Sequence, residues 1–215
     1  MAQIFPKWAN KVPKQIQLGL ILGLTAIVFG FWYFGSPEYL EVGYAPEQPI
    51  PYSHQLHVGE LGLDCRYCHA SVEESAKASI PPTQTCMGCH EQIASDSPAL
   101  EPLRESWETG EPVEWIRVHD IPDLAYFDHS AHVNVGVGCV SCHGRVDRMQ
   151  VVMKTESMSM GWCLDCHNDP GPDLRPVEQV TNMDWQPPED QHELAQMIIS
   201  KRNIAPPTYC NACHR

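Results

Sequence analysis

The stretch FDHSAHVNVGVGCVSCH, residues 127–143, decides how the rest of the chain is interpreted. It contains a His-x-x-His pair that is followed, after six residues, by a Cys-x-x-Cys-His motif. The stretch YSHQLHVGELGLDCRYCH, residues 52–69, has the same two patterns with seven residues between them. A further Cys-x-x-Cys-His motif follows each stretch, and the copies are offset by 75 residues for the histidine pair, 74 for the first motif and 77 for the second. This regularity indicates a duplicated unit, with copies at 52–90 and 127–167.

All ten cysteines of the chain belong to Cys-x-x-Cys-His motifs. In chain order these motifs are Cys65-Cys68-His69, Cys86-Cys89-His90, Cys139-Cys142-His143, Cys163-Cys166-His167 and Cys210-Cys213-His214. The motif is typical of haem c, whose vinyl groups bond to the two thiols while the histidine ligates the iron. Disulfides or structural zinc would not require a histidine after each second cysteine. The sequence therefore predicts five covalent haem c groups, numbered here haem 1 to haem 5 in chain order.

Six histidines lie outside the motifs and are candidates for the second axial position of each iron. Four of them form the two pairs, His54 with His57 and His129 with His132. Histidines three positions apart lie on one side of a helical turn, so one turn can present imidazoles to two neighbouring irons. For haem 5 we favour His119, in an apolar stretch, over His192, on the acidic side of an expected helix. Met160 is a further candidate because methionine can ligate haem iron, although it can equally fill gaps against a haem.

An uncharged apolar run covers residues 16–34. Nineteen residues in a helix span roughly 28 Å, close to a bilayer core of about 30 Å. Lys7, Lys11 and Lys14 precede the run, and aromatic residues flank both of its ends, so the positive-inside rule predicts a cytoplasmic N-terminus. A cleaved signal peptide is the alternative, but the run is long for one and no small-x-small cleavage site follows closely. We expect a cytoplasmic segment at 1–15, a single anchor at 16–34 in the bacterial inner membrane, and a periplasmic haem domain at 35–215.

Composition excludes several classes of protein. The chain of 215 residues has 27 acidic and 14 basic residues and a net charge of -13, which argues against a nucleic-acid-binding protein. One long apolar run is too few for a polytopic membrane protein. The 19 prolines are spread through the chain and interrupt helices and strands. The expected fold is a multihaem cytochrome c, mostly coil with short α-helices packed around haems, plus one N-terminal transmembrane helix.

The order of histidine pairs and haem motifs resembles the small multihaem cytochromes of the c7/c3 class. In that class the first histidine of a pair ligates the haem of the following motif, and the second histidine ligates the next haem. The resemblance therefore implies four assignments: His54 for haem 1, His57 for haem 2, His129 for haem 3 and His132 for haem 4.

Over nearly its whole length the chain resembles the membrane-anchored pentahaem cytochrome c subunit of bacterial alternative complex III, the ActA family. The resemblance is carried by the single anchor, the five motifs, and the stretches at 128–144, 158–167 and 210–214. It implies an electron-transfer subunit of the respiratory chain, without a catalytic site of its own, that relays electrons from quinol oxidation to a periplasmic cytochrome c or a terminal oxidase.

The same resemblance implies partners in one membrane complex: an iron–sulfur subunit, quinol-binding membrane subunits and a monohaem cytochrome c. Two alternatives remain open at this point. One is a membrane-anchored multihaem quinol dehydrogenase of the NapC/NrfH type, which itself binds quinol. The other is a multihaem reductase with one open haem iron, as in nitrite or hydroxylamine reductases.

Overall fold

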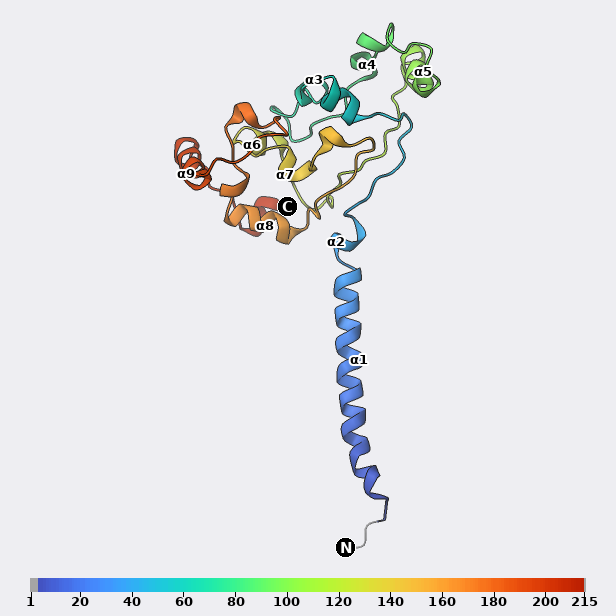
Figure 1. Ribbon diagram of the computed structural model, residues 1–215, viewed down its shortest axis with the longest axis vertical. Helices are drawn as coiled ribbons and strands as arrows, with labels where there is room; N and C mark the ends of the chain where they lie inside the picture. Colours follow the sequence, from blue (N-terminus) through green and yellow to red (C-terminus); the bar gives the residue numbers. More distant parts are fainter. Residues whose placement is uncertain (1–3, 215) are drawn as a thin grey trace. The chain divides into compact units, whose positions relative to one another are not determined.

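The computed structural model describes residues 4–214 and divides the chain into two compact units, Met1–Glu41 and Val42–Arg215 (Figure 1). The first unit contains the 3-10 turn η1 (Lys7–Lys11), the long helix α1 (Val12–Phe34) and the short helix α2 (Pro37–Leu40). A proline in the first turn of α1 presets its backbone, so the helix begins four residues before the apolar run expected from the sequence. The segment Lys7–Phe34 is long and apolar enough to cross a membrane, a property that signal sequences share.

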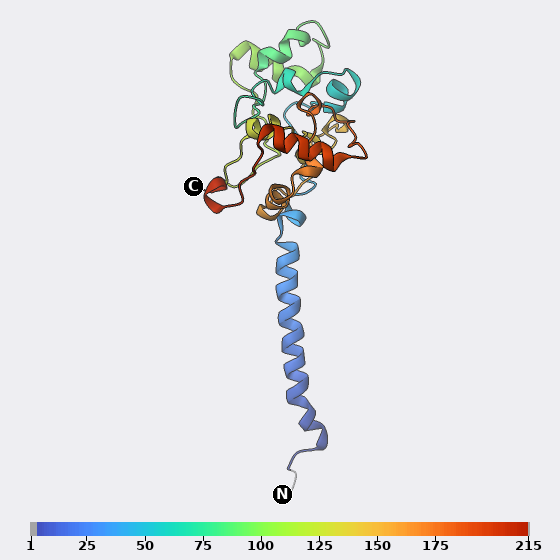
Figure 2. The same cartoon turned by 90° about the vertical axis from the view of Figure 1, so that its left-hand side faces the viewer.

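The second unit is built from short helices joined by coil (Figures 1 and 2). Its α-helices are α3 (Cys65–Cys68), α4 (Thr83–His90), α5 (Glu101–Thr109), α6 (His129–Val133), α7 (Val140–His143), α8 (Met160–Asn168), α9 (Gln191–Arg202) and α10 (Cys210–Cys213). Its other helical turns are η2 (Gln55–Glu60), η3 (Pro98–Leu100), η4 (Val146–Arg148), η5 (Gly171–Asp173) and η6 (Val177–Gln179). Within residues 4–214 the only β-pairing consists of two isolated bridges, Ala125 with His214 and Val137 with Leu174. The prediction of a mostly coiled fold with short helices and one long apolar N-terminal helix is therefore confirmed.

Few apolar side chains of the second unit are buried. Among the residues described these are Ile50, Met87, Leu103, Val133, Leu174, Val180, Met183 and Ala195. They form no single continuous centre, because only Ile50, Met87 and Leu103 cluster together, next to α4 and α5. A domain of this length normally buries a much larger apolar core. The polypeptide alone thus supplies only part of the apolar interior that a stable domain needs.

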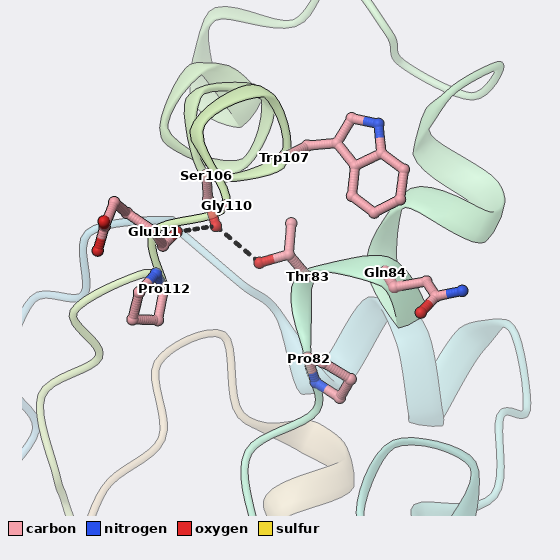
Figure 3. Close-up of a pocket in the computed structure, with 8 residues that line it drawn as sticks. All are labelled: Pro82, Thr83, Gln84, Ser106, Trp107, Gly110, Glu111 and Pro112. Atoms are coloured by element: carbon pink, nitrogen blue, oxygen red, sulfur yellow. Dashed lines mark hydrogen bonds between the residues drawn. The ribbon is translucent and has the colours of Figure 1, made fainter.

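Helices α4 and α5 pack against each other at one end of this unit (Figures 1 and 2). Ser106 of α5 connects them, since its hydroxyl donates to the carbonyl of Glu111 at 2.6 Å and lies 2.7 Å from the hydroxyl of Thr83. Beside this contact is a cavity of about 320 Å³, with Trp107 and Pro112 in its wall (Figure 3). The hydrogen bonds fix the first turn of α4, the helix that carries the second Cys-x-x-Cys-His motif.

The two copies of the sequence repeat contact each other reciprocally. The backbone N–H of Gln55 in the first copy donates to the carbonyl of Met149 at 3.0 Å, and that of Ser130 in the second copy donates to Ser75 at 3.2 Å. Gln55 and Ser130 both directly follow the first histidine of their pair. Ser75 and Met149 both lie ten positions after the first cysteine of their copy. The two hydrogen bonds are therefore equivalent and run in opposite directions.

Equivalent residues also meet where the two copies join. The Cys65 and Cys139 side chains, the first cysteines of the two copies, lie next to each other. A residue that contacts its own equivalent, together with reciprocal contacts on either side, is the pattern of a twofold interface. The duplication thus folds as an internal pseudo-twofold pair, with Cys65 and Cys139 near its axis.

Gly136 holds a turn that no other residue would fit. Its φ is +101°, and a Cβ there would overlap the carbonyl of Arg175, whose N–H donates to the Gly136 carbonyl at 2.9 Å. We expect Gly136→Ala to lower the free energy of unfolding by about 1–3 kcal/mol, measured by thermal denaturation. The control is Gly110→Ala, where φ is +79° but nothing lies within 4 Å. Equal losses in both variants would show that the contact with Arg175 adds nothing.

Candidate haem-binding sites

Each Cys-x-x-Cys-His motif lies on a short helix. Helices α3, α4, α7, α8 and α10 carry the five motifs, so the two cysteines of each lie on one side of a turn and the histidine follows at its end. Side chains fix the start of two of these helices: Asp64 accepts from the N–H of Arg66, and Ser159 accepts from the N–H of Trp162. No cysteine forms a disulfide within residues 4–214. The two cysteines of each motif lie together on one turn, as attachment to one haem requires.

Three histidine pairs face each other across a gap of constant width. Their ring centroids are separated by 6.2 Å for His57 and His90, 6.3 Å for His129 and His143, and 6.0 Å for His132 and His167. An imidazole–metal bond is about 2.0–2.1 Å long and the bonding nitrogen lies about 1.1 Å from the ring centre, so trans imidazoles have centroids roughly 6.3 Å apart. Each gap therefore fits one axially ligated iron, and the pairing is that implied for haems 2, 3 and 4.

Most histidines of the motifs and of the two His-x-x-His pairs are oriented by a backbone carbonyl that binds their Nδ1. The bonds run from His57 to Ser53, His69 to Ser79, His90 to Ile93, His129 to Ala76, His132 to Asp128, His167 to Pro207 and His214 to Leu124, at 2.7–3.1 Å. A carbonyl can only accept, so Nδ1 carries the proton and Nε2 keeps a free lone pair. Such a second hydrogen bond is the usual support for a metal-ligating histidine.

An aromatic residue supports each histidine pair. Tyr52 stacks on His57 with ring centroids 4.4 Å apart, and Phe127 stacks on His132 at 4.6 Å. Each also meets the first histidine of its pair edge-on, at 4.8 Å. Tyr52 and Phe127 occupy equivalent positions in the two copies of the repeat, but the sequence alone does not indicate their role. Their stacking fixes the ring planes of the second histidines and covers them from solvent.

The first sites of the two copies adjoin. Burial, followed by the proximity of His69 and His57, lowers the pKa of His54 to about 4. Burial also lowers the pKa of His143 to about 3, with smaller effects from neighbouring histidines that include His69 and His54. Both imidazoles are therefore neutral at pH 7, which is the form that binds a metal. His54 lies near His69 as the assignment to haem 1 requires, and the haem 1 and haem 3 motifs are neighbours.

His119 lies at the haem 3 motif. Its ring centroid is 4.4 Å from that of His143, too close for two ligands on opposite sides of one iron. Its Nε2 is buried without a hydrogen-bond partner, and burial lowers the pKa of His119 to about 4. Among the residues described, its ring contact is with His143 and none is made with His214. The structure thus does not bring His119 together with the fifth motif.

The other two candidate ligands, His192 for haem 5 and Met160 for any one haem, lie at the surface. Met160, the first residue of α8, is 65% exposed, and His192 is exposed in the first turn of α9. The motif itself is held by residues 124–126, because His214 bonds to Leu124 and the N–H of Tyr126 donates to the carbonyl of Cys213 at 2.7 Å. That docking segment begins five residues after His119. The sixth ligand of haem 5 stays a prediction.

Two comparisons with known proteins bear on these sites. The family of cytochrome c7 and related cytochromes c matches residues 125–215, which include one histidine pair and three haem motifs. A similar relative is the protein named menaquinone reductase, multiheme cytochrome c subunit, of Nitratidesulfovibrio vulgaris strain Hildenborough, 35% identical over 121 residues. That match covers 56% of this chain and 55% of the relative, so the chain spans about half the length of that relative. The motifs, the fold and both similarities together show a multihaem cytochrome c.

Proposed function

We propose that the chain is an electron-transfer subunit that binds five haem c groups and passes electrons along them. The observation that carries this proposal is the set of three histidine pairs whose spacing fits an axially ligated iron. Each haem supplies a one-electron couple. An iron with a histidine on both sides has no open position for a substrate. The chain therefore acts as an electron relay without a catalytic site of its own.

The protein residues have three tasks in this proposal. The cysteines attach the haems, His69, His90, His143, His167 and His214 are the proximal ligands, and the paired histidines are the distal ones. We assign His54 to haem 1, His57 to haem 2, His129 to haem 3 and His132 to haem 4. For haem 5 we keep His119 ahead of His192, and Met160 stays a candidate ligand of one of the five haems.

The proximity of the motifs suggests a single linear path. Cys86 of haem 2 lies near Cys68 of haem 1, and Cys65 of haem 1 lies next to Cys139 of haem 3. Cys142 of haem 3 lies near Cys166 and Cys163 of haem 4, and Cys163 lies near Cys213 of haem 5. We therefore propose the order haem 2, haem 1, haem 3, haem 4, haem 5, in which the step across the pseudo-twofold axis joins haem 1 to haem 3.

We further propose that α1 anchors the chain in the bacterial inner membrane, with residues 1–15 in the cytoplasm and the haem domain, residues 35–215, in the periplasm. Lys7, Lys11 and Lys14 on one side of the apolar helix favour this orientation. The proposed complex is alternative complex III, in which this subunit joins an iron–sulfur subunit to a monohaem cytochrome c or a terminal oxidase.

A second candidate function has the opposite direction of electron flow. The relative from Nitratidesulfovibrio vulgaris is named as a subunit of a menaquinone reductase, which delivers electrons to the quinone instead of taking them from quinol. The linear path serves either direction. What distinguishes the two is the potential of the haems relative to the quinone couple, because electrons flow spontaneously only towards the higher potential.

A potentiometric titration of the purified protein with its haems attached tests the direction. For quinol oxidation we expect the haems at the two ends of the path to titrate above the menaquinone couple of the source membrane. If both ends titrate well below that couple, a menaquinone reductase is supported and quinol oxidation is rejected.

A second experiment separates this proposal from a quinol dehydrogenase of the NapC/NrfH type. Purified full-length chain in detergent is mixed with a menaquinol analogue, and haem reduction is followed by absorbance. We expect no rapid reduction of the isolated chain, but rapid reduction when the intact membrane complex is used. Rapid reduction of the isolated chain would assign quinol binding to this subunit.

A further inference from the structure

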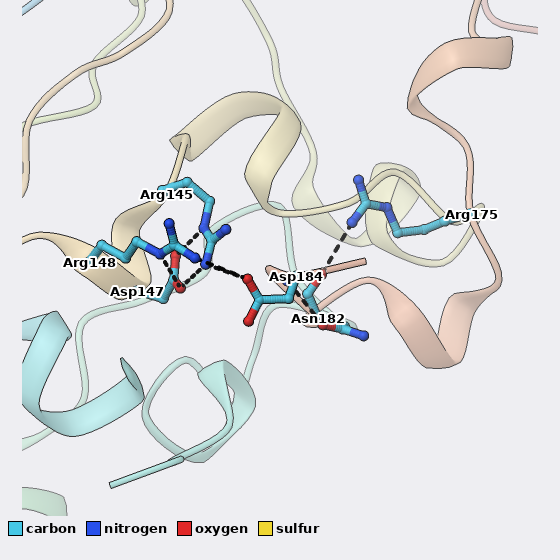
Figure 4. A network of polar contacts seen from close by, with 6 residues as sticks. All are labelled: Arg145, Asp147, Arg148, Arg175, Asn182 and Asp184. Atoms are coloured by element: carbon cyan, nitrogen blue, oxygen red, sulfur yellow. Dashed lines mark hydrogen bonds and ion pairs between the residues drawn. The ribbon is translucent and has the colours of Figure 1, made fainter. Parts of the chain in front are cut away.

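Arg175 is the most buried arginine of the described chain, with 5% of its surface exposed. Its Nη1 donates to the carbonyl of Asn182 at 3.3 Å and its guanidinium lies 4.6 Å from the ring centre of Trp185 (Figure 4). Its Nε is buried and has no hydrogen-bond partner. No carboxylate lies within ion-pair distance of Arg175 among residues 4–214.

Other arginines of the chain show the usual arrangement. Arg145 and Arg148 share Asp147 and Asp184 in a network beside Arg175 (Figure 4). The carboxylate-paired arginines Arg66 and Arg117 lie nearer the surface as well. Burying a charge without a partner costs free energy, so the buried guanidinium of Arg175 calls for a functional explanation.

Arg175 lies next to the motif of haem 3. Its backbone pairs with Gly136, and a Cβ on Gly138 would overlap its guanidinium, so the charge lies over the residue before Cys139. Cys139 is the first attachment point of haem 3. A positive charge in a buried site interacts strongly with a nearby redox centre, because little solvent screens it.

A second cation lies on the ligand side of the same site. Lys154 is 3% exposed, its Nζ donates to the carbonyl of Asp120 at 3.3 Å, and it interacts with His119, which contacts His143. The negative group that acts on Arg175 is Asp173, which lies towards Cys142 and Cys166. The buried cations Arg175 and Lys154 thus lie on two sides of the haem 3 site, and the carboxylates of Asp173 and Glu156 lie towards Cys142.

We propose that Arg175 sets the potential of haem 3: its buried guanidinium, next to Cys139, raises the reduction potential of that haem. Reduction of a ferric haem adds one negative charge, so a fixed positive charge beside it stabilises the reduced form. Haem 3, which lies in the middle of the path, then holds an electron more readily than it would in a neutral site. This inference rests on the proposed attachment of a haem at Cys139 and Cys142.

The test is a potentiometric titration of Arg175→Gln in the full-length protein, followed by electron paramagnetic resonance. The ring planes of His129 and His143 lie within 9° of each other, whereas those of the haem 2 and haem 4 pairs differ by 61° and 41°. A near-parallel pair gives a ferric signal distinct from that of tilted pairs, so haem 3 can be told apart from haems 2 and 4. We expect its signal to disappear at a lower potential in Arg175→Gln and near the wild-type potential in Arg175→Lys.

Two control variants sharpen the result. Arg104→Gln removes an arginine of α5 that also donates to backbone carbonyls, and it should leave haem 3 unchanged. Asp173→Asn removes the nearby negative charge and should shift haem 3 to a higher potential. An unshifted haem 3 in Arg175→Gln, with all five haems present by mass, would overturn the inference while leaving the haem assignment intact.

If Arg175→Gln loses haem 3, Arg175→Met, which keeps the length of the side chain without its charge, carries the test, and an unchanged haem 3 potential there overturns the inference. A wild-type chain that lacks a haem at Cys139 and Cys142 would instead reject the proposed function on which the inference rests. The two failures are therefore distinguishable.

Discussion

Replacing His132 with alanine is expected to convert one low-spin haem to a high-spin haem that binds carbon monoxide. His132 faces His167 across the gap proposed for haem 4, and its removal leaves that iron with one protein ligand. His129 on the same turn keeps its place opposite His143, so haem 3 should be unaffected. Absorbance and magnetic circular dichroism of the purified variant measure the spin state, and carbon monoxide is added to the reduced form.

The control for this experiment is Glu193→Ala, which removes an exposed side chain of α9. It should leave the spin state and carbon monoxide binding of every haem at the wild-type level. A His132→Ala protein without any new high-spin haem would contradict the assignment. A substitute ligand is tested by adding Met160→Leu, because Met160 lies three residues before Cys163.

His129→Met should raise the potential of haem 3 by on the order of 100 mV and slow electron transfer through the whole chain. Methionine opposite histidine favours the reduced iron, and it keeps the iron six-coordinate and low-spin. Because haem 3 lies in the middle of the proposed path, an electron held there blocks passage between the two copies of the repeat. Potentiometry measures the first effect, and stopped-flow oxidation of the fully reduced protein measures the second.

The matched variant is His57→Met, which makes the same chemical change at haem 2, the end of the proposed path. It should raise one potential by a similar amount but leave electron exchange among the other four haems at the wild-type rate. Equal slowing of that exchange in both variants would argue against the linear order. It would not affect the ligand assignments, since these depend on the potentials and the spectra.

The sequence predicts the sites better than it predicts their surroundings. Motif spacing is local, so the cysteines and histidines of each motif can be identified without a structure. The two His-x-x-His pairs that begin at His54 and His129 are also local. Which motif histidine each of their members faces follows from the resemblance to the c7/c3 class. The structure adds the distances, with His57 opposite His90 and His132 opposite His167.

Long-range features could not be predicted from the residues alone. The close approach of Cys65 and Cys139 joins residues 74 positions apart, and repeat spacing does not say how two copies dock. Arg175 is one of several arginines in the sequence, and its burial depends on the bridge that brings Leu174 to Val137. His119 was favoured for haem 5 because its stretch is apolar, but burial alone does not tell which motif a histidine meets.

The number of haems is the quantity on which all of these proposals depend. Intact mass spectrometry of the purified chain, matured in a host that attaches haem c, measures it directly. We expect the polypeptide mass plus five covalently bound haems, because all ten cysteines fall in five motifs. A fully matured preparation that carries four haems or fewer would contradict the pentahaem relay.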